Sequence, residues 1–180
     1  MQLASRRMYT GRVINLDVDT VRFPDGSSGV LEMIRHPGAA AVVPLASDPA
    51  GPDPTILMIR QFRYATGGPL WEIPAGRLSD PTEPPETCAR RELLEEVGVT
   101  AARWQRLTTI WTTPGFTDEA IHLFAASELT PGTHAREPDE FIEVVPLPLS
   151  EVLRQIREGE ICDGKTVSAI LYMAGFVLRL

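Results

Sequence analysis

Glu92, Glu95 and Glu96 are the side chains with the clearest chemical potential in this sequence, because they gather three carboxylates in one short segment. That segment, residues 85–97, is typical of a helix and is followed by Gly98, a residue common just past helix ends. On a helix, positions i, i+3 and i+4 share one face, so the three carboxylates would stand about one turn apart. Their repulsion is about 0.2–0.5 kcal/mol per pair, and a divalent cation bound by their oxygens would compensate it.

The surrounding residues decide against the plainer explanation, which is an acidic helix face turned to solvent. The segment 91–99, RELLEEVGV, resembles the helical half of the Nudix box, R-E-U-x-E-E-x-G-U, where U is a bulky aliphatic residue, and it matches at every position. At about 6% usage per residue, such a match arises by chance on the order of once in a million starting points. By this resemblance the chain is identified as a member of the Nudix hydrolase superfamily.

The first half of the box fits with one departure. Glu83 is separated from Arg91 by seven residues, as the family pattern requires, but six residues separate Gly76 from Glu83 where the usual number is five. The extra residue falls in the loop 77–82, where an insertion is tolerated. We therefore expect an altered loop and an unaltered metal-binding helix. The segments WEIPAG (71–76) and RQFRY (60–64) also resemble Nudix enzymes.

The resemblance implies a metal site and a reaction. Mg²⁺ or Mn²⁺, two or three ions, would be held by Glu92, Glu96 and the backbone carbonyl of Ala75, while Glu95 would share in this or bind metal-coordinated water. Glu83 is open as a ligand or a base, and Arg91 would orient the carboxylates through charge-assisted hydrogen bonds. Such ions prefer carboxylate and water ligands, and they serve diphosphate cleavage by neutralising oxyanions and lowering the pKa of attacking water.

A second segment, TTPGFTDE at 112–119, bears on the substrate. A Pro-Gly turn between strands would explain it by itself. The stretch also resembles the ADP-ribose pyrophosphatase subfamily, which implies hydrolysis of ADP-ribose to AMP and ribose 5-phosphate, with Gly115 and Glu119 at the substrate. A different nucleoside diphosphate sugar, such as GDP-mannose, is the alternative substrate. A non-catalytic Nudix nucleotide sensor is the alternative from another class, although all four box glutamates are present.

The subfamily resemblance implies further residues. The segment 135–144, AREPDEFIEV, matches a loop that carries a catalytic acid, for which Glu140 fits best and Glu137 and Asp139 are alternates; a solvated acidic loop is the plainer explanation. Arg63 would reach the substrate's phosphates, a task suited to a guanidinium, and is otherwise a surface arginine. Glu32 and Arg35 could serve the site of a neighbouring subunit in a homodimer. Candidates for stacking on the base are Tyr9, Phe23 and Trp71.

The elements that carry these residues follow from the pattern of apolar side chains. Residues 12–23 and 30–35 alternate as strands around an Asp25-Gly26 turn, which predicts an N-terminal β-hairpin. Further strands are expected at 39–45, 55–62, 104–111, 120–126 and 142–146, and helices at 85–97, from 150 to 159, and from about 166 onwards. We expect an α+β fold, an α/β/α sandwich with a mixed β-sheet between helices, divided into a hairpin and dimerisation segment (1–36) and a Nudix domain (37–180).

Composition limits the function classes. The 180 residues carry 24 acidic and 17 basic side chains, a net charge of −7, which argues against nucleic-acid binding through phosphates and favours a small anionic substrate bound with a cation. The two cysteines lie in no metal-binding spacing, and no apolar run reaches the ~20 residues of a membrane-spanning helix. We expect a cytoplasmic protein without a membrane partner.

Overall fold

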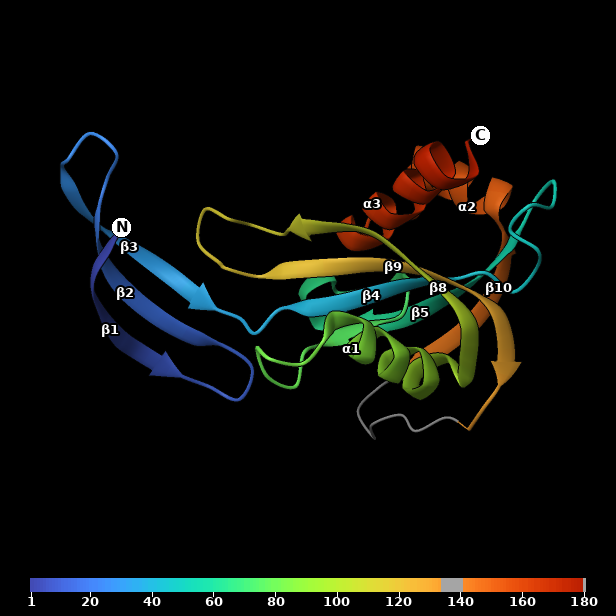
Figure 1. Ribbon diagram of the computed structural model, residues 1–180, viewed down its shortest axis with the longest axis horizontal. Helices are drawn as coiled ribbons and strands as arrows, with labels where there is room; N and C mark the ends of the chain where they lie inside the picture. Colours follow the sequence, from blue (N-terminus) through green and yellow to red (C-terminus); the bar gives the residue numbers. More distant parts are fainter. Residues whose placement is uncertain (134–140, 180) are drawn as a thin grey trace.

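The computed structural model describes residues 1–133 and 141–179, and Figure 1 shows an elongated molecule with helices on two sides of a strand layer and a separate sheet at one end. The strands are β1 (Gln2–Thr10), β2 (Asn15–Arg22), β3 (Ser28–Arg35), β4 (Ala39–Pro44), β5 (Thr55–Arg63), β6 (Gly68–Glu72), β7 (Ala75–Arg77), β8 (Val99–Trp111), β9 (Ala120–Pro131) and β10 (Ile142–Pro148). The helices are α1 (Pro85–Glu92), α2 (Leu149–Glu158) and α3 (Gly164–Tyr172), with short helical segments η1 (Tyr64–Thr66), η2 (Leu93–Val97) and η3 (Met173–Leu178). No described helix is long and apolar enough to cross a membrane.

Strand β4 lies at the centre of the sandwich and is buried along its whole length. Because alternate residues of a strand face opposite sides, Ala41 and Val43 pack toward α2 and α3, while Ala40 and Val42 pack toward α1. The order β7-β4-β9-β8 combines a parallel β4–β9 pair with antiparallel neighbours, and β10-β5-β6 forms a second, antiparallel sheet. The expected α+β sandwich is confirmed, with its strands divided between two sheets.

The N-terminal segment forms a three-stranded antiparallel sheet in the order β1-β2-β3, which projects from the sandwich in Figure 1. The predicted hairpin corresponds to β2 and β3, so the prediction missed β1. Every residue of β1 is exposed, and the strand pairs with β2 through main-chain hydrogen bonds. Its sequence therefore lacks the alternation of apolar and polar residues that predicts a strand. Ile34 at the end of β3 ties the sheet to the sandwich, because its N–H donates to the Phe116 carbonyl at 2.7 Å.

The helix that carries the glutamates begins at Pro85, a residue that suits the first helical position. From Leu93 to Val97 the helix widens into a π-helical turn, a form often found at functional sites. It ends at Gly98, whose φ of 77° lies in the left-handed region that glycine adopts without strain. Helix α3 begins at Gly164, two residues earlier than expected, because Asp163 caps it by accepting a hydrogen bond from the Thr166 N–H.

Candidate active site

Strand β7 lies directly against the carboxylates of the helix. The Ala75 N–H donates to Glu96 Oε2 at 3.0 Å, and both Glu92 and Glu96 are buried. A Cβ at Gly76 would come within 1.9 Å of Glu92 Oε1, so the carboxylate occupies space that any other residue at this position would fill. A larger residue at position 76 would therefore force the Glu92 carboxylate out of the position it occupies against the strand.

Arg91 connects the acidic side chains to one another. Its Nη1 donates to Glu92 Oε1 at 2.5 Å and to Glu95 Oε2 at 3.2 Å, and its Nη2 donates to the Arg77 carbonyl at 3.1 Å. Although burial lowers the pKa of the Arg91 guanidinium, the charge of Glu92 and its other partners raise it overall, so Arg91 stays positively charged. A fixed cation at this position offsets part of the repulsion among the carboxylates.

Glu83 lies beside this group rather than within it. Its Oε2 accepts a hydrogen bond from the Ser79 N–H at 2.6 Å and lies 3.7 Å from Arg91 Nη2. The carboxylate therefore braces the loop that carries the extra residue. Glu83 does not line the cavity that the other three glutamates share.

That cavity has a volume of about 360 Å³ and is the candidate metal site. Its lining residues are Gln61, Arg63, Ala75, Gly76, Arg77, Leu78, Ser79, Arg91, Glu92, Glu95 and Glu96. No three His, Cys, Asp or Glu side chains within residues 1–133 and 141–179 are grouped so as to enclose a metal ion by themselves. Magnesium-like ions bind few protein groups and keep several waters, so a set of helical carboxylates beside a Cβ-free glycine fits a hydrated divalent cation.

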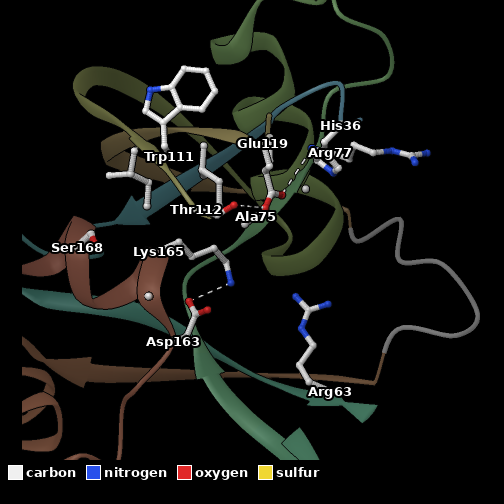
Figure 2. A pocket seen from close by; sticks show the side chains of 15 residues that line it. His36, Arg63, Ala75, Arg77, Trp111, Thr112, Glu119, Asp163, Lys165 and Ser168 are labelled. Atoms are coloured by element: carbon white, nitrogen blue, oxygen red, sulfur yellow. Dashed lines mark hydrogen bonds and ion pairs between the residues drawn. The ribbon is translucent and has the colours of Figure 1, made fainter. Parts of the chain in front are cut away.

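A larger cavity of about 720 Å³ adjoins the first and is shown in Figure 2. The two cavities share Arg63, Ala75, Gly76 and Arg77. The larger one is also lined by His36, Ala39, Ile110, Trp111, Thr112, Glu119, Ile121, Asp163, Gly164, Lys165 and Ser168. A ligand could therefore extend from the carboxylates, past Arg63, into a space of the size that small molecules occupy.

Arg63 belongs to an ionic network that sequence reasoning did not foresee. It donates two hydrogen bonds to Glu72, at 2.7 and 2.8 Å, and Lys165 Nζ contacts the same carboxylate. Lys165 also donates to Asp163 at 3.0 Å, as Figure 2 shows. Burial raises the pKa of Glu72, which is 1% exposed, but the hydrogen bonds from Arg63 and the charge of Lys165 outweigh it and lower the pKa overall.

Lys165 carries no local sequence signal of its role beyond being the only lysine in the chain. Its side chain is 11% exposed, and lysines are almost never so buried unless they are paired. Its partner Glu72 stands 93 residues earlier. Only the fold brings the two residues together.

The remaining predicted site residues fall in different places. Glu119 lines the larger cavity, where its carboxylate lies 3.6 Å from His36 Nδ1 and accepts a hydrogen bond from Thr112 at 2.9 Å. Gly115 lies in an exposed turn and does not line either cavity. Arg35 is engaged within its own chain, by Asp17, Asp19 and Asp118. Glu32 is exposed on β3, and Glu137, Asp139 and Glu140 lie outside the described residues.

The aromatic residue at the larger cavity is one that was not predicted. Trp111 lines it and is 61% exposed, at the end of β8. Of the predicted candidates, Tyr9 and Phe23 lie in or beside the N-terminal sheet, and Trp71 packs against the apolar core. An exposed indole at the mouth of a cavity can stack on a flat ring without losing core packing.

Comparison with known proteins identifies relatives over most of the chain. A family model described as the NUDIX domain matches residues 35–169. An ADP-ribose pyrophosphatase from Bacillus subtilis (strain 168) is 39% identical over 173 residues, which cover 95% of this chain and 90% of that protein. A GDP-mannose pyrophosphatase from Escherichia coli O1:K1 / APEC is 40% identical over 129 residues, 66% of each chain. A crystal structure of an ADP compounds hydrolase superposes with a TM-score of 0.82 at 20% identity, covering 100% of this chain and 96% of that one, which supports the fold.

Proposed function

This chain belongs to the Nudix family, and from that premise we propose that it hydrolyses the diphosphate of ADP-ribose, giving AMP and ribose 5-phosphate. The observation that carries the proposal is the junction of two cavities at Arg63, one lined by carboxylates and the other large enough for the rest of a nucleotide. The identity of 39% to an ADP-ribose pyrophosphatase over nearly the whole chain supports the same substrate. The net charge of −7 supports a small-molecule substrate rather than nucleic acid.

In this reaction, water forms a new P–O bond to one phosphorus as the bridging P–O bond breaks. Glu92, Glu96 and the Ala75 carbonyl would hold two or three Mg²⁺ or Mn²⁺ ions, which would supply charge neutralisation at the diphosphate and a lowered pKa of the attacking water. Arg91 orients Glu92 and Glu95 through its hydrogen bonds. Glu95 would join the ligands or bind metal-coordinated water, and Glu83 stabilises the preceding loop.

Arg63, which lines both cavities, and Lys165, which lines the larger one, bind the substrate. Buried Glu72 holds the side chains of Arg63 and Lys165 in position, so their positive charges are already oriented when an anionic diphosphate binds. Asp163 is occupied as the cap of α3 and as a partner of Lys165. The part of the substrate beyond the diphosphate lies in the larger cavity, where Trp111 and Glu119 provide a stacking surface and a hydrogen-bond acceptor.

The proton of the attacking water requires an acceptor. We assign this role to Glu140, with Glu137 as the alternate, on the resemblance of the segment 135–144 to the catalytic loop of ADP-ribose pyrophosphatases. Both residues lie outside the described part of the chain. Replacing each by glutamine in turn would identify the base, because only its loss removes proton acceptance.

We propose that the protein is a homodimer formed through the N-terminal sheet, residues 1–36. This sheet exposes many large apolar side chains, namely Leu3, Met8, Tyr9, Val13, Ile14, Phe23, Val30 and Leu31, and an exposed apolar surface of this kind marks an interaction site. Light scattering should give twice the mass of 19.8 kDa. The two unpaired cysteines, Cys88 and Cys162, are consistent with a cytoplasmic location.

The substrate is tested by product analysis of the purified protein with Mg²⁺ against ADP-ribose, GDP-mannose, NADH, diadenosine polyphosphates and nucleoside triphosphates. The proposal predicts fast release of AMP from ADP-ribose, abolished by EDTA. Preferential release of GMP from GDP-mannose would favour the second candidate, which the similarity to a GDP-mannose pyrophosphatase supports. The absence of hydrolysis of every compound would favour a nucleotide sensor.

A further inference from the structure

Strand β5 presents Gln61 to the carboxylates of the helix. Leu57 and Ile59 pack in the apolar cluster beneath α1, and because alternate residues share a face of a strand, Gln61 and Arg63 continue that face beyond the cluster. Both line the cavity that also contains Glu92, Glu95 and Glu96. Gln61 is therefore a polar side chain at the point where an apolar strand face meets the candidate metal site.

The Gln61 amide is buried, and its oxygen lacks a partner among the described residues. The residue is 7% exposed, and its Oε1 accepts no hydrogen bond from residues 1–133 and 141–179. An unpaired buried polar atom destabilises the fold, and such an atom in a native structure points to a water, an ion or a catalytic role. Arg91 lines the same cavity, and its Nε also lacks a hydrogen-bond partner in the described part of the chain.

The chemistry of the cavity restricts what can satisfy Gln61. An amide oxygen needs a donor, and the ionised carboxylates around it can only accept. Arg63 and Arg91 also line the cavity, but neither donates to this oxygen. Water can donate to an amide oxygen, and the volume of about 360 Å³ far exceeds the ~30 Å³ share of one water. The waters that a magnesium-like ion keeps are strong donors of this kind.

We propose that Gln61 is a positioning residue of the metal site, and that its amide oxygen accepts a hydrogen bond from the hydration water of the divalent cation. This inference rests on the proposed function in one respect, the presence of a cation at Glu92 and Glu96. Outer contacts of this kind change metal affinity by about 10–100-fold when removed. The polar atom that weakens the folded protein without metal thus stabilises the metal-loaded site.

Gln61→Leu tests the proposal, with Gln155→Leu as the matched control. Gln155 is also 7% exposed with an unpaired Oε1, but it lies on α2 and lines neither site cavity. Mn²⁺ binding would be measured by calorimetry without substrate, together with the urea unfolding midpoint of the metal-free proteins. Gln61→Leu should bind Mn²⁺ about tenfold more weakly while its metal-free midpoint stays equal or rises, and Gln155→Leu should keep wild-type affinity.

The outcomes separate this inference from the proposed function. Wild-type affinity for Mn²⁺ in Gln61→Leu would overturn the role of Gln61 and leave the proposed function intact. If the wild-type protein bound no Mn²⁺, both would fall, whereas Mn²⁺ binding without ADP-ribose hydrolysis would contradict only the substrate. Should Gln61→Leu not fold, Gln61→Glu decides: it keeps an acceptor oxygen and should bind Mn²⁺ at least as tightly as wild type, and weaker binding contradicts the proposal.

Discussion

Gly76 and Glu92 are packed so closely that a Cβ on the glycine would lie 1.9 Å from a carboxylate oxygen of the glutamate. The contact joins β7 to α1, and it places the Glu92 carboxylate against the backbone of the strand that also donates to Glu96 through Ala75. The close contact with Glu92 thus gives a steric reason for the glycine that the family pattern has at position 76. Backbone flexibility is not its cause, because Gly76 is not among the glycines with positive φ.

Gly76→Ala should displace the Glu92 carboxylate and weaken the metal site. The new methyl group cannot fit unless the side chain or the strand moves, so we expect Mn²⁺ affinity to fall by at least about tenfold and activity to fall with it. Mn²⁺ titration measures the effect. Gly175→Ala is the control, because a Cβ there meets no atom within 4 Å; equal Mn²⁺ affinity in the two variants would refute the steric argument.

Glu72→Gln should destabilise the protein in a pH-dependent way. Removing the buried carboxylate leaves Arg63 and Lys165 without their shared partner, a loss of about 3 kcal/mol near pH 7. Because the folded-state pKa of Glu72 is lowered, its stabilisation is present above about pH 4.3, the ordinary value for glutamate, and is lost as the pH falls through the folded-state pKa.

Urea unfolding of wild type and Glu72→Gln between pH 3 and pH 7 measures this pH dependence. The difference between their free energies of unfolding should shrink as the pH falls below about 4.3. The exposed helical pair of Glu86 with Arg90 gives a control, since Glu86→Gln should change stability by less than about 0.5 kcal/mol. A difference between Glu72→Gln and wild type that stays constant with pH would contradict the account.

Lys165→Met should raise the KM for ADP-ribose about tenfold, a loss of about 1.4 kcal/mol of binding, with a smaller change in kcat. The exposed Arg157 on α2 provides the control variant Arg157→Met. As the only lysine, Lys165 can also be followed by amine acylation and mass spectrometry, with the exposed amino group of Met1 as the internal reference. Substrate should protect Lys165 and not Met1, and equal labelling of Lys165 with and without substrate would exclude the contact.

Local patterns were sufficient to predict the elements that carry the metal site. The apolar run of β4 and the Pro85 to Gly98 helix are each defined by consecutive residues, whereas β8 begins at Val99, five residues before the predicted start. Strand β1 was not predictable in this way, because it is fully exposed and is defined by its register with β2. Its sequence shows no alternation between a buried and a solvent face.

The substrate side of the site was less predictable because it depends on contacts between distant residues. Glu72 and Lys165 are 93 residues apart, and each alone reads as an ordinary charged side chain. Gln61 could have been noticed as a polar residue on the face of β5 that carries Leu57 and Ile59. Trp71 was predicted in place of Trp111, but it is partly buried and packs against the apolar core.

The most direct test of the account compares initial rates of AMP release from ADP-ribose at saturating Mg²⁺ for wild type, Glu96→Gln and Glu86→Gln. Both changes remove one carboxylate from the same helix, but Glu96 is 2% exposed beside the Ala75 N–H, whereas Glu86 lies on the surface. The account predicts that Glu96→Gln folds normally and loses about a hundredfold or more of the rate, while Glu86→Gln stays within about twofold of wild type. Near-normal turnover by Glu96→Gln would contradict catalysis at this helix.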